Sequence, residues 1–270
     1  MTPTPLHHAD HPGTAPALLL VHGWGGNGGD WDPTLPYWRH RVIVPDLRGH
    51  GRSPKPGEGY GARDFAADLA ELLRGLDTGP VVAVGHSMGG QAVTALAVEH
   101  PELVRGLVVV DPAYGTHEAE AARIPAAQEE LRAEGPEWAA RFVTGAFRPG
   151  MYDELRDRQR QLMAEMDTDV LVRCRDGMYL NPDAFGLRPA TVTYLARRAC
   201  PVLGVYATPG AAEFERGTLT DPRSRVTVFD GAGHYLHEER PREFVEVVEH
   251  WLSDWVTEAQ AESGRPSSAP

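Results

Sequence analysis

Short apolar runs alternate with amphipathic segments along most of the chain. Continuous apolar runs flanked by turn residues are typical of strands buried on both faces. Such runs occupy residues 17–21, 42–44, 81–84, 107–110 and 202–206, and residues 225–229 supply a last strand. Between them, residues 62–76, 88–100 and 242–258 place apolar side chains at helical spacing. This alternation predicts an α/β fold with a doubly wound, mostly parallel sheet.

The alternation stops between residues 112 and 188. This segment is rich in charge and helical in pattern, with Trp138 and Phe142 one helical turn apart. We interpret it as a helical lid inserted into a core formed by residues 1–111 and 189–258. The aromatic side chains of such a lid pack between its helices or line a pocket beneath it. Residues 259–270 are small, polar and proline-containing, which predicts a disordered tail.

The strand expected at residues 81–84 leads into Gly85-His86-Ser87-Met88-Gly89, and a helical pattern follows directly. Gly-x-Ser-x-Gly between a strand and a helix is a nucleophile elbow, a turn that exposes a serine hydroxyl above the sheet. A glycine-rich connection without chemistry is the alternative. The flanking strand and helix favour the catalytic interpretation, so Ser87 is the candidate nucleophile.

A serine nucleophile needs a base, and the base needs an orienting acid. In folds with this elbow the chain order is serine, acid, histidine, with the histidine in the loop after the last strand. His234 fits that place because it follows residues 225–229 by a short glycine-rich loop. His237 is the nearest rival among the chain's 12 histidines.

Composition narrows the classes of partner. The formal net charge of −12 and the lack of a basic stripe disfavour nucleic acid. No apolar run approaches the length of a bilayer span, and the N-terminus lacks the pattern of a signal peptide. The two cysteines have no metal-ligand spacing, so a reducing cytoplasm is expected. His7, His8 and His11 are interpreted as part of a mobile tail rather than as metal ligands.

Four segments in the same order as in a known family carry a wider resemblance. They are residues 21–26 (Val-His-Gly-Trp-Gly-Gly), 46–53 (Asp-Leu-Arg-Gly-His-Gly-Arg-Ser), the elbow, and 233–241 (Gly-His-Tyr-Leu-His-Glu-Glu-Arg-Pro). Together they resemble the serine-nucleophile branch of the α/β-hydrolase superfamily, in its esterase and lactonase-like members. The resemblance spans nearly the whole core, from about residue 18 to residue 255. The segment 46–53 is interpreted as structural, a brace beneath the site.

The resemblance implies an oxyanion hole formed by two backbone N–H groups, those of Trp24 and Met88. Such donors stabilise the negative charge that appears on the carbonyl oxygen during acyl transfer. The Trp24 indole is also a candidate wall of the acyl pocket. Trp138 and Phe142 are candidate substrate-binding residues of the lid.

The acid departs from the commonest family pattern. The turn after residues 202–206 carries no carboxylate before Glu213. Some relatives, including lipases of the pancreatic type, instead place the acid at the end of the preceding strand, where this chain has Asp111. We therefore assign the acid to Asp111, with Glu213, Glu215 and Asp221 as alternatives.

These residues predict a serine hydrolase that cleaves a carboxylic ester or lactone of a small to medium, largely apolar acyl compound. Thioesterases, carbon–carbon hydrolases and cofactor-free perhydrolases share the same triad and remain open. A cyclase or ligand-binding protein on the same scaffold is the non-hydrolytic alternative. No cofactor and no metal are expected, and the protein is expected to be a monomer or homodimer whose partner is its small-molecule substrate.

Overall fold

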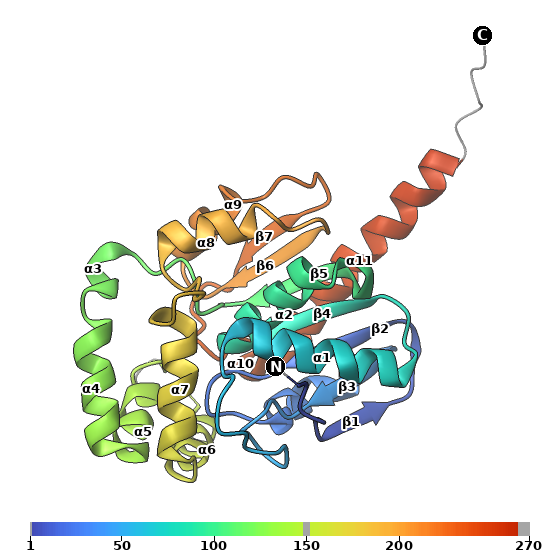
Figure 1. The fold of residues 1–270 in the computed structure, drawn as a ribbon. Coiled ribbons are helices and arrows are strands. Elements are labelled where there is room, and N and C mark those ends of the chain that lie inside the picture. Colours follow the sequence, from blue (N-terminus) through green and yellow to red (C-terminus); the bar gives the residue numbers. More distant parts are fainter. Residues whose placement is uncertain (1, 148–151, 264–270) are drawn as a thin grey trace.

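The computed structural model describes residues 2–147 and 152–263, in which one sheet is flanked by helices (Figure 1). The sheet has seven strands in the order β1-β3-β2-β4-β5-β6-β7. Strand β1 runs antiparallel to β3, and the other neighbouring pairs are parallel. The predicted doubly wound, mostly parallel sheet is therefore confirmed. The strands are β1 His8–His11, β2 Thr14–Val21, β3 His40–Pro45, β4 Val81–His86, β5 Val104–Val110, β6 Val202–Tyr206 and β7 Arg225–Val228.

Strand β1 corrects the expectation of a mobile N-terminal tail. His8 pairs with Pro45 and His11 with Val42, so these residues extend the edge of the sheet. Asp10 anchors the strand through Arg41, whose Nε and Nη2 donate to its two carboxylate oxygens at 3.0 and 2.7 Å. The tail interpretation failed because the segment's short polar pattern lacks the apolar run that marks a buried strand.

Alternate strand residues pack against helices on opposite faces of the sheet. On one face, Leu19 and Val21 join the buried cluster that contains Phe65 of α1. On the other face, Leu18 and Leu20 join a cluster with residues of η1 and α11. The core helices are α1 Ala62–Leu76, α2 Met88–Glu99, α9 Pro209–Arg216, α10 Leu236–Glu239 and α11 Pro241–Ser263, with the 3₁₀ turns η1 Gly28–Tyr37 and η2 Pro101–Leu103.

The described residues between β5 and β6 form six helices, of which α3 to α7 gather beside one end of the sheet (Figure 1). They are α3 Glu118–Ala121, α4 Ile124–Glu134, α5 Pro136–Thr144, α6 Asp153–Ala164, α7 Thr168–Tyr179 and α8 Arg188–Leu195. We call residues 112–188 the insertion. Within it, residues 148–151 lie outside the described part of the chain.

A buried polar network joins α6 of the insertion to the core. Arg158 forms ion pairs with Asp30 at 3.0 Å and with Glu238 at 2.8 Å. The Gln159 amide donates to the same two carboxylates at 3.2 and 2.8 Å. Burial raises the pKa of both Asp30 and Glu238. The two carboxylates therefore need the charge of Arg158 and the hydrogen bonds of Gln159 to offset the cost of removing them from water.

At the C-terminus, α11 continues to Ser263, so the predicted disorder is wrong for residues 259–263. Residues 264–270 of that predicted tail lie outside the described residues. None of the helices in the described part of the chain combines the length and apolar character needed to cross a bilayer.

The junction of β4 and α2 leaves no room for side chains at two glycines. A Cβ on Gly85 would overlap the carbonyl oxygen of Gly89, and a Cβ on Gly89 would overlap the carbonyl oxygens of Val21 and His22. These contacts are with backbone, which cannot move aside as a flexible side chain does. The absence of side chains here lets α2 approach the ends of β4 and β2.

We predict that Gly89→Ala lowers the free energy of unfolding by about 1–3 kcal/mol, because the methyl group forces the backbone apart. Chemical denaturation monitored by circular dichroism measures the change. Gly75→Ala is the matched control, since Gly75 is an exposed position of α1 where an added Cβ would meet no atom within 4 Å. That control is expected to raise stability by about 0.5–1 kcal/mol. Equal effects of the two substitutions would contradict the steric argument.

His237 and His50 are buried, and both are held in the neutral form. His237 lies between Trp31, with ring centroids 4.3 Å apart, and His86 at 4.6 Å. Neither of its ring nitrogens has a hydrogen-bond partner among the described residues. Burial lowers the pKa of His237 to about 3 and that of His50 to about 3. In the unfolded chain both rings take up a proton near their ordinary pKa, so acid favours unfolding.

Because the folded pKa is depressed, the neutral rings contribute stability above about pH 6.5 that is lost as pH falls toward 3. We predict that His237→Phe reduces the slope of unfolding free energy against pH by about 1.4 kcal/mol per pH unit over that interval. Urea denaturation at a series of pH values measures the slope. His250→Phe, at an exposed position of α11, is the control and keeps the wild-type slope. An unchanged slope in His237→Phe would show that His237 does not contribute to acid unfolding.

Candidate active site

Ser87 occupies the turn between β4 and α2 in a backbone conformation that non-glycine residues rarely adopt, with φ 51° and ψ −115°. The turn is held by hydrogen bonds on both sides. Ser87 N donates to Val110 O at 3.0 Å, and Ser87 O accepts from Gly90 N at 2.9 Å and Ala113 N at 3.0 Å. The side chain is partly exposed. The predicted strand, sharp turn and helix are therefore present around Ser87.

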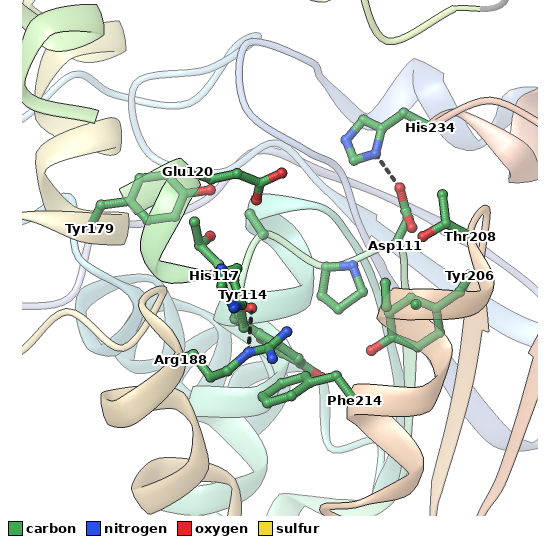
Figure 2. A pocket seen from close by; sticks show the side chains of 16 residues that line it. Asp111, Tyr114, His117, Glu120, Tyr179, Arg188, Tyr206, Thr208, Phe214 and His234 are labelled. Carbon is green, nitrogen blue, oxygen red and sulfur yellow. Dashed lines mark hydrogen bonds and ion pairs between the residues drawn. The ribbon is translucent and has the colours of Figure 1, made fainter. Parts of the chain in front are cut away.

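His234 and Asp111 meet at the carboxyl ends of the sheet strands. His234 Nδ1 lies 2.6 Å from Asp111 Oδ2, and both side chains remain partly exposed (Figure 2). Asp111 follows β5 directly, with φ 41°, and its N–H donates to Val205 O at 2.8 Å. Its other carboxylate oxygen accepts from Ala207 N at 3.3 Å. Asp111 is thus oriented by the backbone of β6, the adjacent strand.

The other carboxylates considered for the acid are engaged elsewhere. Glu215 is fully buried and accepts hydrogen bonds from the Tyr114 and Tyr206 hydroxyls at 3.0 and 2.9 Å, and it also pairs with Arg198. Glu213 pairs with Arg216 at 3.2 Å, and Asp221 pairs with Arg223 at 2.7 Å. The structure therefore brings His234 together with Asp111 and not with these three.

The histidine rings around the turn have distinct environments. His86 Nε2 donates to the carbonyl oxygen of His234 at 3.0 Å, and the two rings lie 4.6 Å apart. Burial, with a smaller effect from neighbouring His234, holds the pKa of His86 well below its usual range. His237 is fully buried against Trp31 and has no carboxylate partner among the described contacts. His234 is the histidine that reaches both solvent and Asp111.

The loop that carries Trp24 lies against the serine turn. A Cβ on Gly23 would lie 3.3 Å from Ser87 Cβ, which measures how closely the two loops approach. Neither Trp24 N nor Met88 N donates a hydrogen bond to another described residue. His50 Nε2 accepts from Gly25 N at 3.2 Å, so residues 46–53 brace this loop from below.

A cleft of about 410 Å³ opens beside His234 and Asp111. In Figure 2, Tyr179 and Glu120 of the insertion stand across this cleft from His234 and Asp111, and Phe214 and Arg188 lie at its base. The insertion also touches the histidine loop directly, since His234 N donates to Ala146 O at 3.1 Å. The cleft is thus formed jointly by the sheet edge and the insertion.

The three predicted aromatic residues meet where the Trp24 loop contacts the insertion. Trp138 stacks on Phe142 with centroids 5.0 Å apart, and Phe142 meets Trp24 edge to face at 5.9 Å. Trp24 Nε1 donates to Leu171 O at 3.1 Å, which ties the loop to α7. Phe142 is half exposed, whereas Trp24 and Trp138 are buried.

Sequence reasoning missed Arg175, whose guanidinium lies among these rings. Its carbon Cζ is 5.5 Å from the Trp24 ring centroid and 5.1 Å from that of Phe142. The available signal is a charged residue on the apolar face of α7, between buried Cys174 and Met178. That pattern identifies a buried charge but not its neighbours.

Nothing in the described part of the chain groups three or more histidine, cysteine, aspartate or glutamate side chains in a way that could hold a metal ion.

Comparison with known proteins agrees with this architecture. The model of a family described as the alpha/beta hydrolase family matches residues 18–247. A 2-(acetamidomethylene)succinate hydrolase from Mesorhizobium japonicum is 29% identical over 253 residues, which cover 89% of each chain. A pimeloyl-[acyl-carrier protein] methyl ester esterase from Aeromonas hydrophila is 29% identical, covering 89% of this chain and 96% of the relative.

Among solved structures, a thermophilic esterase from Thermogutta terrifontis superposes with a TM-score of 0.78 at 27% identity, covering 92% of this chain and 93% of the esterase. The relatives are named hydrolases and esterases, and the family match spans both halves of the core as well as the insertion. The chain is an enzyme that belongs to the alpha/beta hydrolase family.

Proposed function

We propose that the protein is a serine hydrolase that cleaves a carboxylic ester or lactone through an acyl-enzyme intermediate. One observation carries the proposal: the 2.6 Å contact between His234 Nδ1 and Asp111 Oδ2 at the edge where the elbow presents Ser87. A carboxylate on Nδ1 fixes the imidazole tautomer that leaves Nε2 free to accept a proton. The three side chains come from three separate strand ends, in the chain order serine, acid, histidine.

In the first half-reaction Ser87 Oγ attacks the carbonyl carbon of the substrate while its proton passes to His234 Nε2. Asp111 stabilises the resulting imidazolium through the Nδ1 hydrogen bond. The oxyanion accepts hydrogen bonds from the N–H groups of Trp24 and Met88. Loss of one such donor typically costs about 3 kcal/mol of transition-state stabilisation.

The tetrahedral intermediate then collapses, and the bond between the carbonyl carbon and the leaving oxygen breaks. His234 returns the proton to that oxygen, which leaves as an alcohol or, when the substrate is a lactone, stays on the ring-opened acyl group as a hydroxyl. In the second half-reaction a water attacks the acyl-enzyme, with His234 again acting as base. The products are a carboxylic acid and free Ser87.

The substrate class rests on the aromatic wall and on the relatives. Trp24, Trp138 and Phe142 favour a small to medium acyl compound that is largely apolar. Relatives are named for a methyl ester, for a diacylglycerol and for an acetamidomethylene compound, which support acyl-group hydrolysis in general. A thioesterase, a carbon–carbon hydrolase and a perhydrolase would use the same three side chains. A panel of esters, lactones and thioesters of graded acyl length separates them.

We also propose a small-molecule substrate as the partner and the cytoplasm as the compartment. Cys174 and Cys200 are free thiols, which supports a reducing environment.

We predict that a fluorophosphonate probe labels the protein covalently at Ser87, because an activated serine attacks phosphorus as it attacks a carbonyl carbon. Intact mass spectrometry followed by peptide mapping locates the label. Ser87→Ala is expected to take up no label. Ser253→Ala, at an exposed position of α11, is the control and keeps wild-type labelling. Folded wild-type protein with neither labelling nor turnover of aryl esters would favour the cyclase or ligand-binding alternative.

We predict that Asp111→Asn lowers kcat by about three to four orders of magnitude, because an amide at this position stabilises the wrong histidine tautomer. Steady-state hydrolysis of an aryl ester measures the loss. Glu213→Gln is the matched control, since Glu213 is an exposed carboxylate paired with Arg216, and it is expected to keep wild-type kcat. Near-wild-type activity in Asp111→Asn would transfer the orienting role to another carboxylate.

A further inference from the structure

Arg175 is a buried cation surrounded by aromatic rings. Its residue is only 6% exposed, and its Cζ lies between 5.1 and 5.9 Å from the ring centroids of four side chains. These are Trp24, Trp138, Phe142 and Tyr179. Trp24 belongs to the loop that lies against Ser87, so the guanidinium sits at the junction of the insertion and the candidate active site.

The carboxylate nearest in sequence is already engaged. Both oxygens of Asp176 accept hydrogen bonds from Arg132 Nη2, at 3.0 and 2.9 Å, and one also accepts from the Gln128 amide. Among the described residues, the hydrogen bond that Arg175 makes runs from Nε to Gln128 Oε1 at 3.2 Å, and no carboxylate pairs with it. Gln128 therefore orients the planar group without neutralising it.

A buried guanidinium without a counter-ion is energetically unfavourable. Burial lowers the pKa of Arg175, but the ordinary value of arginine is so high that the group remains a cation at neutral pH. The aromatic faces attract the cation only weakly. They also offer no oxygen or nitrogen atom that could accept hydrogen bonds from its terminal N–H groups. A planar fork of N–H donors fits a carboxylate in bidentate geometry.

Arg175 lines a cavity of about 330 Å³ whose walls are formed by residues of the insertion. This cavity shares Thr116, Glu120 and Tyr179 with the cleft that His234 and Asp111 line, so the two spaces adjoin. Tyr179 and Glu120 mark the shared wall in Figure 2. Glu120 is an exposed carboxylate on this wall, and Arg123 lines the same cavity.

We propose that Arg175 binds a carboxylate of the substrate at the end remote from the scissile bond, so that the enzyme prefers monoesters of dicarboxylic acids, or acid-substituted lactones, over uncharged analogues. This inference rests on the proposed hydrolase function. The apolar stem of the substrate lies against the rings of Phe142 and Tyr179, which line the cavity, and the terminal carboxylate supplies the ion-pair partner that Arg175 lacks among the described residues.

The test compares esters of equal acyl carbon number with and without the remote carboxylate. Monomethyl succinate, glutarate and adipate are paired with methyl butanoate, pentanoate and hexanoate, and acid release is followed by titration at constant pH. We expect wild-type kcat/KM to favour the charged ester of the best-fitting pair by at least about tenfold, the usual scale of a charge-assisted hydrogen bond.

Arg175→Met keeps an unbranched apolar stem without the charge and is expected to lower that preference by about tenfold or more. Arg173→Met is the matched control, since Arg173 is an exposed residue on the outer side of the same helix. It removes the same charge and is expected to keep the wild-type preference. The comparison therefore separates recognition by Arg175 from a general effect of the net charge of the protein.

A wild-type enzyme that favours the uncharged esters, or an Arg175→Met enzyme that keeps the wild-type preference, would overturn the proposal. Calorimetric titration with adipate gives a readout that needs no turnover. Binding to the wild type, and weaker binding to Arg175→Met, supports anion recognition even if no ester is cleaved, in which case only the hydrolase proposal fails. If Arg175→Met does not fold, Arg175→Lys takes its place and is expected to retain part of the preference, because it keeps the charge but loses the bidentate fork. Undetectable adipate binding to folded wild type together with equal rates on both esters rejects the inference.

Discussion

The close approach of α2 to the ends of β2 and β4 is the constraint on which the rest of the site depends. It exists because Gly85 and Gly89 have no side chain, so backbone meets backbone at the elbow. That approach forces Ser87 into its left-handed conformation and places the Trp24 loop beside it. The neighbouring strand then supplies Asp111 at the same edge, and the loop after β7 supplies His234. One packing requirement therefore positions four separate segments.

Buried charged side chains in this molecule have two kinds of surroundings, with or without a partner of opposite charge. Where the insertion meets the core at α6, Asp30 and Glu238 are matched by Arg158 and Gln159. Deep in the core, Arg48 is matched by Asp68 at 2.5 Å. Arg175 departs from this rule, because its surroundings are aromatic and its neighbour Asp176 serves Arg132. The exception lies against Trp24 of the candidate active site, where we propose that a carboxylate of the substrate completes the pairing.

The insertion contributes residues to the wall of the candidate site. Ala146 accepts from the backbone of His234, Leu171 accepts from the Trp24 indole, and Tyr179 forms part of the cleft wall. The sheet edge thus carries the groups proposed for acyl transfer, and the insertion carries the groups proposed for substrate recognition. This division agrees with a family in which one core reaction is adapted to many substrates.

The sequence by itself determined the sheet, the elbow and the order of the candidate catalytic residues, because buried strands and tight turns depend on local periodicity and glycine placement. It also limited the candidates for the orienting acid to a few carboxylates. Only the tertiary structure shows which of them lies beside His234, because His234 and Asp111 are separated by more than a hundred residues and meet through strand pairing. The edge strand at His8–His11 escaped prediction because its pairing with β3 is non-local. The environment of Arg175 escaped it for the same reason: its rings come from separate segments that only folding brings together.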